Sequence, residues 1–338
     1  MKNTALDGWM ATADPFLGPL RALADDLTER TGVPLDLSAT LFRRARLAGF
    51  TPPGRISAGG SCRLLGTADG WAAVNLARPD DQASLPALLA LLGTPGGDLI
   101  TAAEQVTAGH FAESAQMLGI AAAAHRSDAS GRAPVRAERH GWRQPRTLAG
   151  LRVVDLSALW AGPLCAKLLG LAGAHVVKTE STTRPDGARF GHPEFYRWLH
   201  DGHESLVLDF SSGALAQVVA EADVVIEASR PRALRRLGIH PEQFLAARPG
   251  RVWVGITGYG RQDDRIAFGD DAAVAGGLTG LDTRGDPVFL GDALADPVTG
   301  LYAARAVVRS LASGGGELLC VSMAACAAAL AASAPRPC

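Results

Sequence analysis

The sequence lacks the features that mark several large classes of protein. Lys and Arg (33) nearly balance Asp and Glu (34) over 338 residues, so there is no basic excess for nucleic acid or an anionic membrane. The most apolar stretches, residues 85–92 and 323–332, are shorter than the roughly 20 residues of a transmembrane helix. The start of the chain shows no pattern of a secretory leader. We therefore expect neither a nucleic-acid nor a membrane partner.

The five cysteines lack the spacing of a metal site or of a disulfide framework. The sequence contains no CxxC pair and no histidine at metal-ligand spacing from a cysteine. Cys165 and Cys320 lie within apolar runs, which is typical of small core residues. We expect reduced cysteines, no metal ion and a cytoplasmic location. The five are Cys62, Cys165, Cys320, Cys326 and Cys338.

Hydrophobic residues make up 47% of the chain, enough for a sizeable core, and their pattern changes near residue 148. From there on, short apolar strands alternate with helices, which predicts a doubly wound, mainly parallel Rossmann-like sheet. Ligands of such sheets bind beyond the carboxyl ends of the strands. The expected strands cover residues 152–156, 175–180, 205–210, 223–227, 251–257 and 317–322.

The first part of the chain predicts a smaller α+β domain. A helix over residues 37–47, with Asp36 as its N-cap, precedes a hairpin over residues 62–76 whose turn contains Asp69-Gly70. Residues 127–147 are rich in Arg, Ser, Gly and Pro and have no apolar periodicity, as in a linker. We expect a smaller domain over residues 1–126, a linker over 127–147 and the large α/β domain over 148–338.

Two segments of the large domain carry residues suited to chemistry. The loop over residues 157–163 places small residues at a helix N-terminus, where backbone N–H groups bind anions, although a tight connection with Pro163 at the first helical position also explains it. Its pattern is neither GxGxxG nor a P-loop. Asp296 directly precedes a helix expected over residues 297–311. Its pattern is typical of an N-cap, worth roughly 1 kcal/mol, and is compatible with a nucleophile, because a helix N-terminus stabilises the carboxylate anion.

Other polar residues are ambiguous. Asp270 and Asp271 are either paired carboxylates or, as we expect, caps in a solvated loop. A basic run follows one strand end and is either a solvated face or, beside a cleft, a site for the phosphates of a nucleotide-like ligand. The run consists of Arg230, Arg232, Arg235 and Arg236.

Ordered motifs in residues 148–323 resemble a known family. Residues 148–157 followed by Ala161-Gly162-Pro163, residues 171–180, and residues 295–304 around Asp296 are similar to the signatures of the family III coenzyme A-transferases (CaiB/BaiF type). Each motif is modest alone, but together and in order they are specific. Further matches are residues 205–210, 222–227, 237–238 and 255–260.

The resemblance implies an enzyme that transfers CoA from an acyl-CoA thioester to a carboxylic acid, with CoA as part of its substrate. Asp296 matches the catalytic aspartate, which would attack the thioester to form a mixed anhydride. The CoA thiolate would then form an enzyme-bound thioester, from which an acceptor acid takes the CoA. Family members form interlocked dimers, so a homodimer is expected. The positions that match CoA contacts are Trp160, Ala161, Gly162, Pro163, Ala233, Arg236 and Leu237.

The chain also departs from the family pattern. Trp160 stands where Gln is common, His203-Glu204 where a basic pair is usual, and Ala228 where Asn is common. The large domain follows the segment that resembles the small domain, a permutation-like layout. Two alternatives stay open. One is an acyl-CoA racemase or epimerase, which in this family uses a His and Asp pair, although residues 268–271 contain no His. The other is a catalytically silent CoA-binding subunit.

Overall fold

The computed structural model describes residues 4–128 and 131–333 and contains a sheet of seven strands. The strand order is β4-β12-β9-β8-β5-β6-β7, and all neighbours pair in parallel except β4 and β12. This confirms the predicted doubly wound α/β fold. The strands are β4 (Val135–Arg139), β5 (Arg152–Asp155), β6 (His175–Ser181), β7 (Glu204–Leu208), β8 (Val224–Glu227), β9 (Val252–Thr257) and β12 (Glu317–Ser322).

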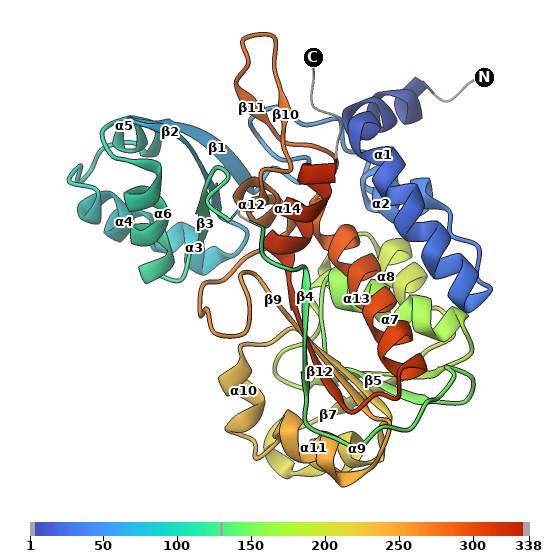
Figure 1. Cartoon of the computed structure of the whole chain (residues 1–338). Coiled ribbons are helices and arrows are strands. Elements are labelled where there is room, and N and C mark those ends of the chain that lie inside the picture. Colours follow the sequence, from blue (N-terminus) through green and yellow to red (C-terminus); the bar gives the residue numbers. More distant parts are fainter. Residues whose placement is uncertain (1–3, 129–130, 334–338) are drawn as a thin grey trace.

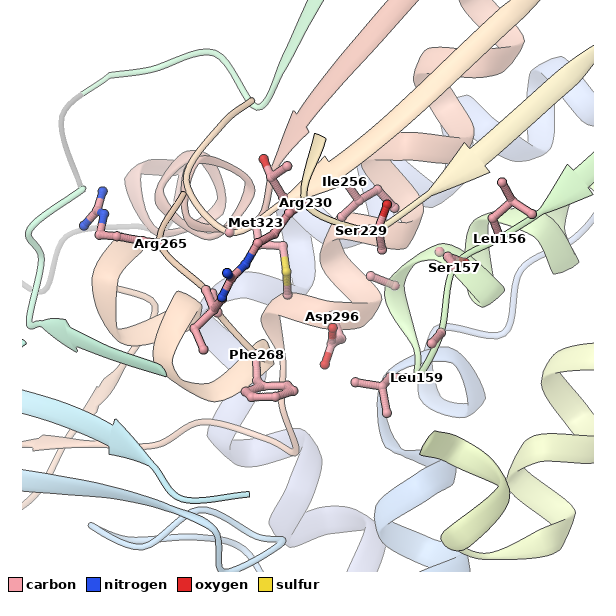
Figure 2. A pocket seen from close by; sticks show the side chains of 18 of the residues that line it. Leu156, Ser157, Leu159, Ser229, Arg230, Ile256, Arg265, Phe268, Asp296 and Met323 are labelled. Carbon is pink, nitrogen blue, oxygen red and sulfur yellow. The ribbon is translucent and has the colours of Figure 1, made fainter. Parts of the chain in front are cut away.

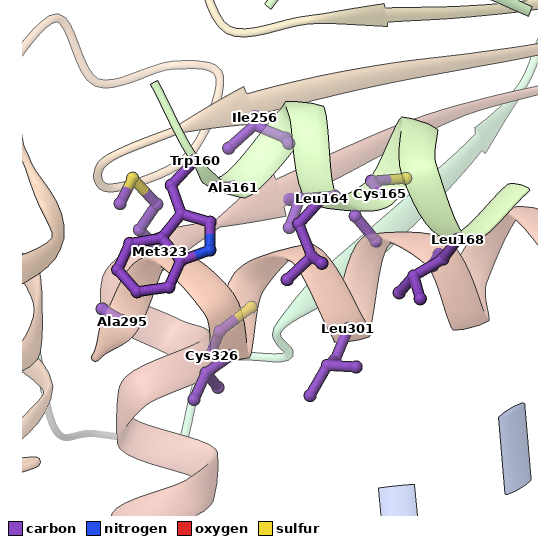
Figure 3. Close-up of a cluster of buried hydrophobic side chains, with 14 of the residues drawn as sticks. Trp160, Ala161, Leu164, Cys165, Leu168, Ile256, Ala295, Leu301, Met323 and Cys326 are labelled. Carbon is purple, nitrogen blue, oxygen red and sulfur yellow. The ribbon is translucent and has the colours of Figure 1, made fainter. Parts of the chain in front are cut away.

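Helices cover both faces of this sheet (Figure 1). Because successive side chains of a strand point to opposite faces, Val153 joins one core and Val154 the other. Figure 3 shows part of the first core, where Leu164 and Leu168 of α7 lie next to α13. On the first face lie α7 (Ala161–Leu171), α8 (Pro193–His200), α13 (Ala295–Ala312) and α14 (Met323–Ser333). On the second lie α9 (Ala214–Glu221), α10 (Pro231–Arg235) and α11 (Pro241–Ala247).

The close packing of α7 against α13 brings their first turns together. A Cβ atom at Gly300 would lie 2.8 Å from the carbonyl oxygen of Ala161, so only glycine allows this approach. Ala161 opens α7, and Asp296 lies in the first turn of α13. One glycine therefore places the loop before α7 beside Asp296.

A second, antiparallel sheet contains the hairpin predicted around Asp69-Gly70. Its order is β1-β2-β3, formed by Cys62–Thr67, Gly70–Asn75 and Ala121–Ala124. Asp69 accepts a hydrogen bond at 2.7 Å from the backbone of Ala108, which ties the turn to α6. Short helices cover one face: α3 (Pro79–Ala83), α4 (Leu85–Leu91), α5 (Leu99–Glu104) and α6 (Ala108–Met117). The other face contacts α12 (Gly269–Gly276), which connects this sheet to the active-site region.

The two N-terminal helices belong to the core of the large sheet. Buried residues Leu20 of α1 (Thr4–Thr31) and Leu41 of α2 (Leu37–Ala48) share a hydrophobic cluster with Leu164 of α7. The predicted cap at Asp36 is confirmed, since its side chain accepts from the backbone N–H of Ala39 at 3.0 Å. The division into residues 1–126, 127–147 and 148–338 stays a prediction, and this packing favours a boundary after α2.

The segment expected to be an irregular linker contains a strand. Residues 135–139 form β4, which pairs with β12 at the edge of the large sheet. An edge strand buries little surface, and its polar sequence, VRAER, has no apolar alternation by which it could be recognised. Residues 129–130 of this segment, and residues 334–338 with Cys338, lie outside the described residues.

The remaining elements are short. A two-residue pair, β10 (Gly280–Leu281) and β11 (Pro287–Val288), forms a small hairpin, and 3-10 turns cover Gly187–Phe190 and Phe210–Ser212. Cys165 and Cys320 are buried, as their apolar runs predict. No helix in residues 4–128 or 131–333 has both the length and the hydropathy to cross a membrane.

Candidate active site

A cleft of about 390 Å³ opens beyond the carboxyl ends of β5, β8, β9 and β12 (Figure 2). This is where the strand order reverses between β5 and β8, the usual ligand position in such sheets. We call it the strand-end cleft. Its lining comes from residues 156–159, 161–162, 228–230, 256–258 and 263–268, with Arg184, Asp296 and Met323.

Asp296 lies inside the first turn of α13, not before it. The helix begins at Ala295 with Leu294 as its N-cap, so the prediction that Asp296 is the N-cap is wrong by two positions. The backbone N–H of Gly269 donates a hydrogen bond to the Asp296 carboxylate. Gly269 must be glycine, because a Cβ atom there would lie 2.5 Å from the backbone carbonyl oxygen of Ala293 and 2.5 Å from Asp296 Oδ2. Figure 2 shows the partly exposed Asp296 between Leu159 and Phe268.

Burial makes Asp296 a weaker acid than usual. Its pKa is raised to about 7: burial is the main cause, Arg44 opposes the rise, and the charges of Asp270 and Asp292 add to it. Burial and the charge of Asp292 likewise raise the pKa of Asp270 to about 6. The helix dipole at the start of α13 favours the anion, but burial outweighs it in the pKa of Asp296. Its carboxyl group exchanges a proton near pH 7.

Arg44 of α2 is the cation of this cluster, and the sequence did not single it out. Its Nε donates to Asp292 Oδ2 at 2.7 Å, and its Nη2 donates to the other carboxylate oxygen. The guanidinium also lies 5.3 Å from the centroid of the Trp160 ring. Asp292 is fully buried. Arg44 follows another arginine in α2 and resembles a solvated helix face in sequence, so only the fold reveals its partner.

The expectation of a solvated loop at Asp270 and Asp271 is wrong, because both residues are buried in the first turn of α12. Asp270 accepts a hydrogen bond from the backbone of Ala293 at 3.1 Å. Asp271 caps the helix by accepting from the backbone of Phe268 at 2.9 Å, and it also accepts from Asn75 Nδ2 at 3.3 Å. Burial raises the pKa of Asp271 to about 7. Asn75 thus connects the antiparallel sheet β1-β2-β3, which we call the hairpin sheet, to the carboxylates around Asp296.

A buried ion network supports the loop of Ser157 and Leu159, which lines the strand-end cleft. Lys178 Nζ lies 2.9 Å from Asp186 and 3.6 Å from Asp155, and it donates to the backbone carbonyl of Ser157. Although burial lowers it, the two carboxylates hold the pKa of Lys178 above its ordinary value. Asp186 also accepts from the N–H of Leu159 at 2.8 Å. The backbone of Leu159 is in the left-handed region, with φ of 70°, which is strained for leucine. Its hydrogen bond to Asp186 stabilises this conformation.

The residues predicted to contact CoA fall into four places. Ala161 and Gly162 line the strand-end cleft, and a Cβ atom at Gly162 would lie 2.0 Å from Ser157 Oγ. Pro163 is buried in α7, and Trp160 faces a different cavity. Ala233, Arg236 and Leu237 are exposed on or just after α10, outside the lining of the cleft.

Helix α10 nevertheless adjoins the rim of the strand-end cleft. Arg230, which precedes it, lines the cleft. Arg232 in α10 lies 3.2 Å from Asp264, another lining residue. The CoA contacts of Ala233, Arg236 and Leu237 stay a prediction. Their position on or just after α10, an exposed basic helix beside the cleft, is compatible with it.

The departures from the family pattern differ in their distance from the cleft. Ala228 lines it. His203 and Glu204 do not: a Cβ atom at Gly170 of α7 would lie 3.2 Å from the His203 ring, and Glu204 pairs with His175 at 3.0 Å. Trp160 packs edge-to-face on Phe195, with 5.1 Å between ring centroids.

A second cavity, of about 300 Å³, lies on the other side of Asp296. We call it the aromatic cavity, after Phe50, Trp160, Phe195 and Phe268 in its lining. Its wall also includes residues of α2 and of the hairpin sheet. Three residues line both spaces: Leu159, Phe268 and Asp296.

A sequence model of the family described as CoA-transferase family III matches residues 148–336. The chain belongs to this family. The match covers every motif on which the resemblance rests, which confirms it. It begins after the segment that supplies Arg44, Phe50 and Asn75, so part of this family III protein's site lies outside the match.

Curated relatives of this family III chain include CoA-transferases of several organisms. The succinyl-CoA–L-malate CoA-transferase beta subunit of Chloroflexus aurantiacus is 34% identical over 181 residues, which are 48% of this chain and 45% of the relative. The succinyl-CoA:glutarate CoA-transferase of Homo sapiens is 29% identical over 182 residues, 49% of this chain and 42% of the relative. The chain spans about half the length of the curated relatives it matches.

A solved structure shares the fold of about half of the chain. A crystal structure of a hypothetical protein from Mycobacterium tuberculosis superposes with a TM-score of 0.50 and 27% identity. The superposition covers 56% of this chain and 58% of that chain. The likeness again concerns about half of each protein.

Proposed function

We propose that this protein transfers CoA from an acyl-CoA thioester to a carboxylic acid through covalent intermediates on Asp296. The observation that carries the proposal is the position of Asp296. Its partly exposed carboxyl group lies where the strand-end cleft and the aromatic cavity meet. A thioester carbonyl at this point would have CoA on one side and its acyl group on the other.

The proposed reaction exchanges bonds at two carbonyl carbons. Asp296 attacks the thioester carbonyl, a C–O bond forms, the C–S bond breaks, and CoA leaves as the thiolate beside a mixed anhydride. The thiolate then attacks the Asp296 side-chain carbonyl, which releases the acyl group as a carboxylate and leaves CoA in thioester linkage to the protein. The acceptor carboxylate repeats both steps in reverse. No oxidant, reductant or water is consumed.

Residues around Asp296 support these steps. The first N–H groups of a helix have no partner within it, so the first turn of α7, at Ala161 and Gly162, suits the negative charge that develops on the thioester oxygen. The nucleophile must be ionised, so a pKa of about 7 for Asp296 predicts that initial kcat/KM rises with pH up to about 7 and then levels off.

Mass spectrometry after incubation with a mixture of acyl-CoA thioesters tests the proposal. We expect a CoA adduct that maps to Asp296, and its loss in Asp296→Asn, since an amide cannot form the anhydride. Asp25→Asn makes the same change on the exposed face of α1, away from both cavities, and should keep the adduct. An adduct that survives Asp296→Asn would contradict the proposal.

The two alternatives predict different outcomes. A racemase would incorporate solvent deuterium at the acyl α-carbon without a CoA adduct, and Asp270 with Asp296 would be its two titrating groups in one cavity. A silent subunit would bind CoA in calorimetry and convert no thioester. The homodimer, the absence of a metal and the cytoplasmic location stay predictions.

A further inference from the structure

The aromatic cavity is a candidate site for the acyl group of the substrate, which would identify the class of acid that this protein accepts. The inference rests on the proposed function, because it assumes that the thioester carbonyl reaches Asp296. Among the described residues, the cavity shares three lining residues with the strand-end cleft: Leu159, Phe268 and Asp296. With CoA in the larger cleft, the group bonded to the thioester carbon points into the aromatic cavity.

The walls of the cavity are mainly apolar. Four aromatic side chains, Phe50, Trp160, Phe195 and Phe268, are joined by small residues such as Ala48 and Ala77. A volume of about 300 Å³ lies at the lower end for small-molecule sites, which fits a short or single-ring acyl group. Aromatic walls bind aliphatic or aromatic groups without requiring a charge.

The charges at the cavity oppose a second carboxylate. Arg44 is the only Lys or Arg among the described lining residues, and two of its nitrogens already bind Asp292. Asp270 and Asp296 also line the cavity, so one guanidinium faces three carboxyl groups. Burial is the main cause of the raised pKa values of Asp270 and Asp296, and the charge of Asp292 raises both further, so a second anion in this cavity would meet an environment that already disfavours negative charge. A further carboxylate would add a fourth.

Much of this wall is specific to the part of the chain outside the family match. Arg44, Phe50, Gly59 and Asn75 precede residue 148, where the match begins. The acyl groups of relatives that share only the matched half therefore do not determine what this cavity accepts.

We propose that the aromatic cavity selects an uncharged, apolar acyl group, aliphatic or aromatic, over a dicarboxylic one. Butyryl-CoA and succinyl-CoA provide a matched comparison, because both acyl chains have four carbons and differ by a methyl group against a carboxylate. We expect kcat/KM for CoA transfer to be about tenfold or more higher with butyryl-CoA. Equal values, or a preference for succinyl-CoA, would overturn the proposal.

A binding measurement separates this inference from the proposed function. In Asp296→Asn the thioester is not consumed, so calorimetry can compare the affinities of butyryl-CoA, succinyl-CoA and free CoA. We expect butyryl-CoA to bind more tightly than CoA, and succinyl-CoA no more tightly than CoA. If butyryl-CoA binds most tightly but the wild type transfers no CoA, the proposed transferase function is wrong and the acyl site stands. If the three affinities are indistinguishable but CoA is transferred, the function stands and the acyl site is wrong.

Gly59 offers a way to fill the cavity. A Cβ atom there would lie 3.8 Å from Arg44 Nη2 and 4.0 Å from Phe50 Cε2, ordinary contacts with two lining residues. Gly59→Leu should therefore lower kcat/KM for benzoyl-CoA about tenfold more than it lowers that for acetyl-CoA. Gly54→Leu is the control, since a Cβ atom at Gly54 meets nothing within 4 Å and Gly54 lines neither space. Equal losses for both thioesters in Gly59→Leu would overturn the assignment.

Discussion

The two spaces that meet at Asp296 are built from different parts of the chain. The strand-end cleft is lined by loops of the large sheet, all within the segment that matches the family. The aromatic cavity takes part of its wall from α2 and the hairpin sheet, which precede that segment. The ion pairs beside them also differ. Lys178 lies between two buried carboxylates under the cleft loop, whereas Arg44 binds one buried carboxylate, that of Asp292, beside the aromatic cavity.

This difference separates what the family resemblance explains from what it does not. The cleft follows from a general property of doubly wound sheets and from motifs shared with CoA-transferases. The aromatic cavity depends on contacts between residues far apart in the sequence, such as Arg44 with Asp292, 248 residues later. We therefore expect changes at the cleft to affect all thioesters alike, and changes at the aromatic cavity to affect them according to their acyl groups.

The largest effect should come from Lys178→Met. The substitution leaves Asp155 and Asp186 buried without their cation and removes the hydrogen bond from Lys178 to the Ser157 carbonyl, so we expect a loss of about 5 kcal/mol of unfolding free energy. Urea unfolding measures it. Lys167→Met is the control, because Lys167 packs on Trp198 and has no ion pair among the described contacts; it should cost about 1 kcal/mol. Similar losses in both variants would refute a structural role for the network.

Arg44→Met should have the next largest effect, about 3 kcal/mol, because it leaves the fully buried Asp292 unpaired. The double variant Arg44→Met with Asp292→Asn should recover more than half of that loss, since no buried charge then lacks its partner. Urea unfolding of the two single variants and the double variant gives the coupling. If the losses of unfolding free energy in the two single variants simply add up in the double variant, Arg44 and Asp292 do not stabilise the fold through their ion pair.

The pH dependence of stability should show the cluster directly. An unfolded aspartate has a pKa of about 3.9, whereas that of Asp296 is about 7 in the fold. Between these values the folded protein binds more protons than the unfolded chain, so its unfolding free energy falls as the pH rises. Asp296→Asn removes this titration. We expect the unfolding free energy of the wild type to fall between pH 5 and pH 8 by on the order of 2 kcal/mol more than that of the variant. Parallel curves, as expected for Asp25→Asn, would contradict the raised pKa.

The outcome of the sequence predictions follows the same division. Alternation of apolar strands and helices was enough for the large sheet, and Asp36 and Asp69-Gly70 marked a cap and a turn correctly, because these signals are local. The strand β4 was missed because an edge strand needs little apolar surface. The burial of Asp270 and Asp271, and the ion pair of Arg44, were not predictable, because each depends on which distant segment covers the residue.

The smallest predicted effect concerns Ala228, the one departure from the family pattern that lines the strand-end cleft. Family members commonly carry Asn there, and Ala228→Asn adds a side chain that can hydrogen-bond to the CoA part of the substrate. A single hydrogen bond contributes about 1 kcal/mol, so we expect the Kd for free CoA to fall about fivefold in calorimetry. The ratio of kcat/KM between butyryl-CoA and succinyl-CoA should stay unchanged, because Ala228 does not line the aromatic cavity.

The substitution Ala77→Asn should have the reverse effect, because Ala77 lines the aromatic cavity. We expect it to change the ratio of kcat/KM between the two thioesters and to leave the Kd for free CoA unchanged. If either substitution alters both quantities equally, the two spaces are not the separate CoA and acyl sites that their linings indicate.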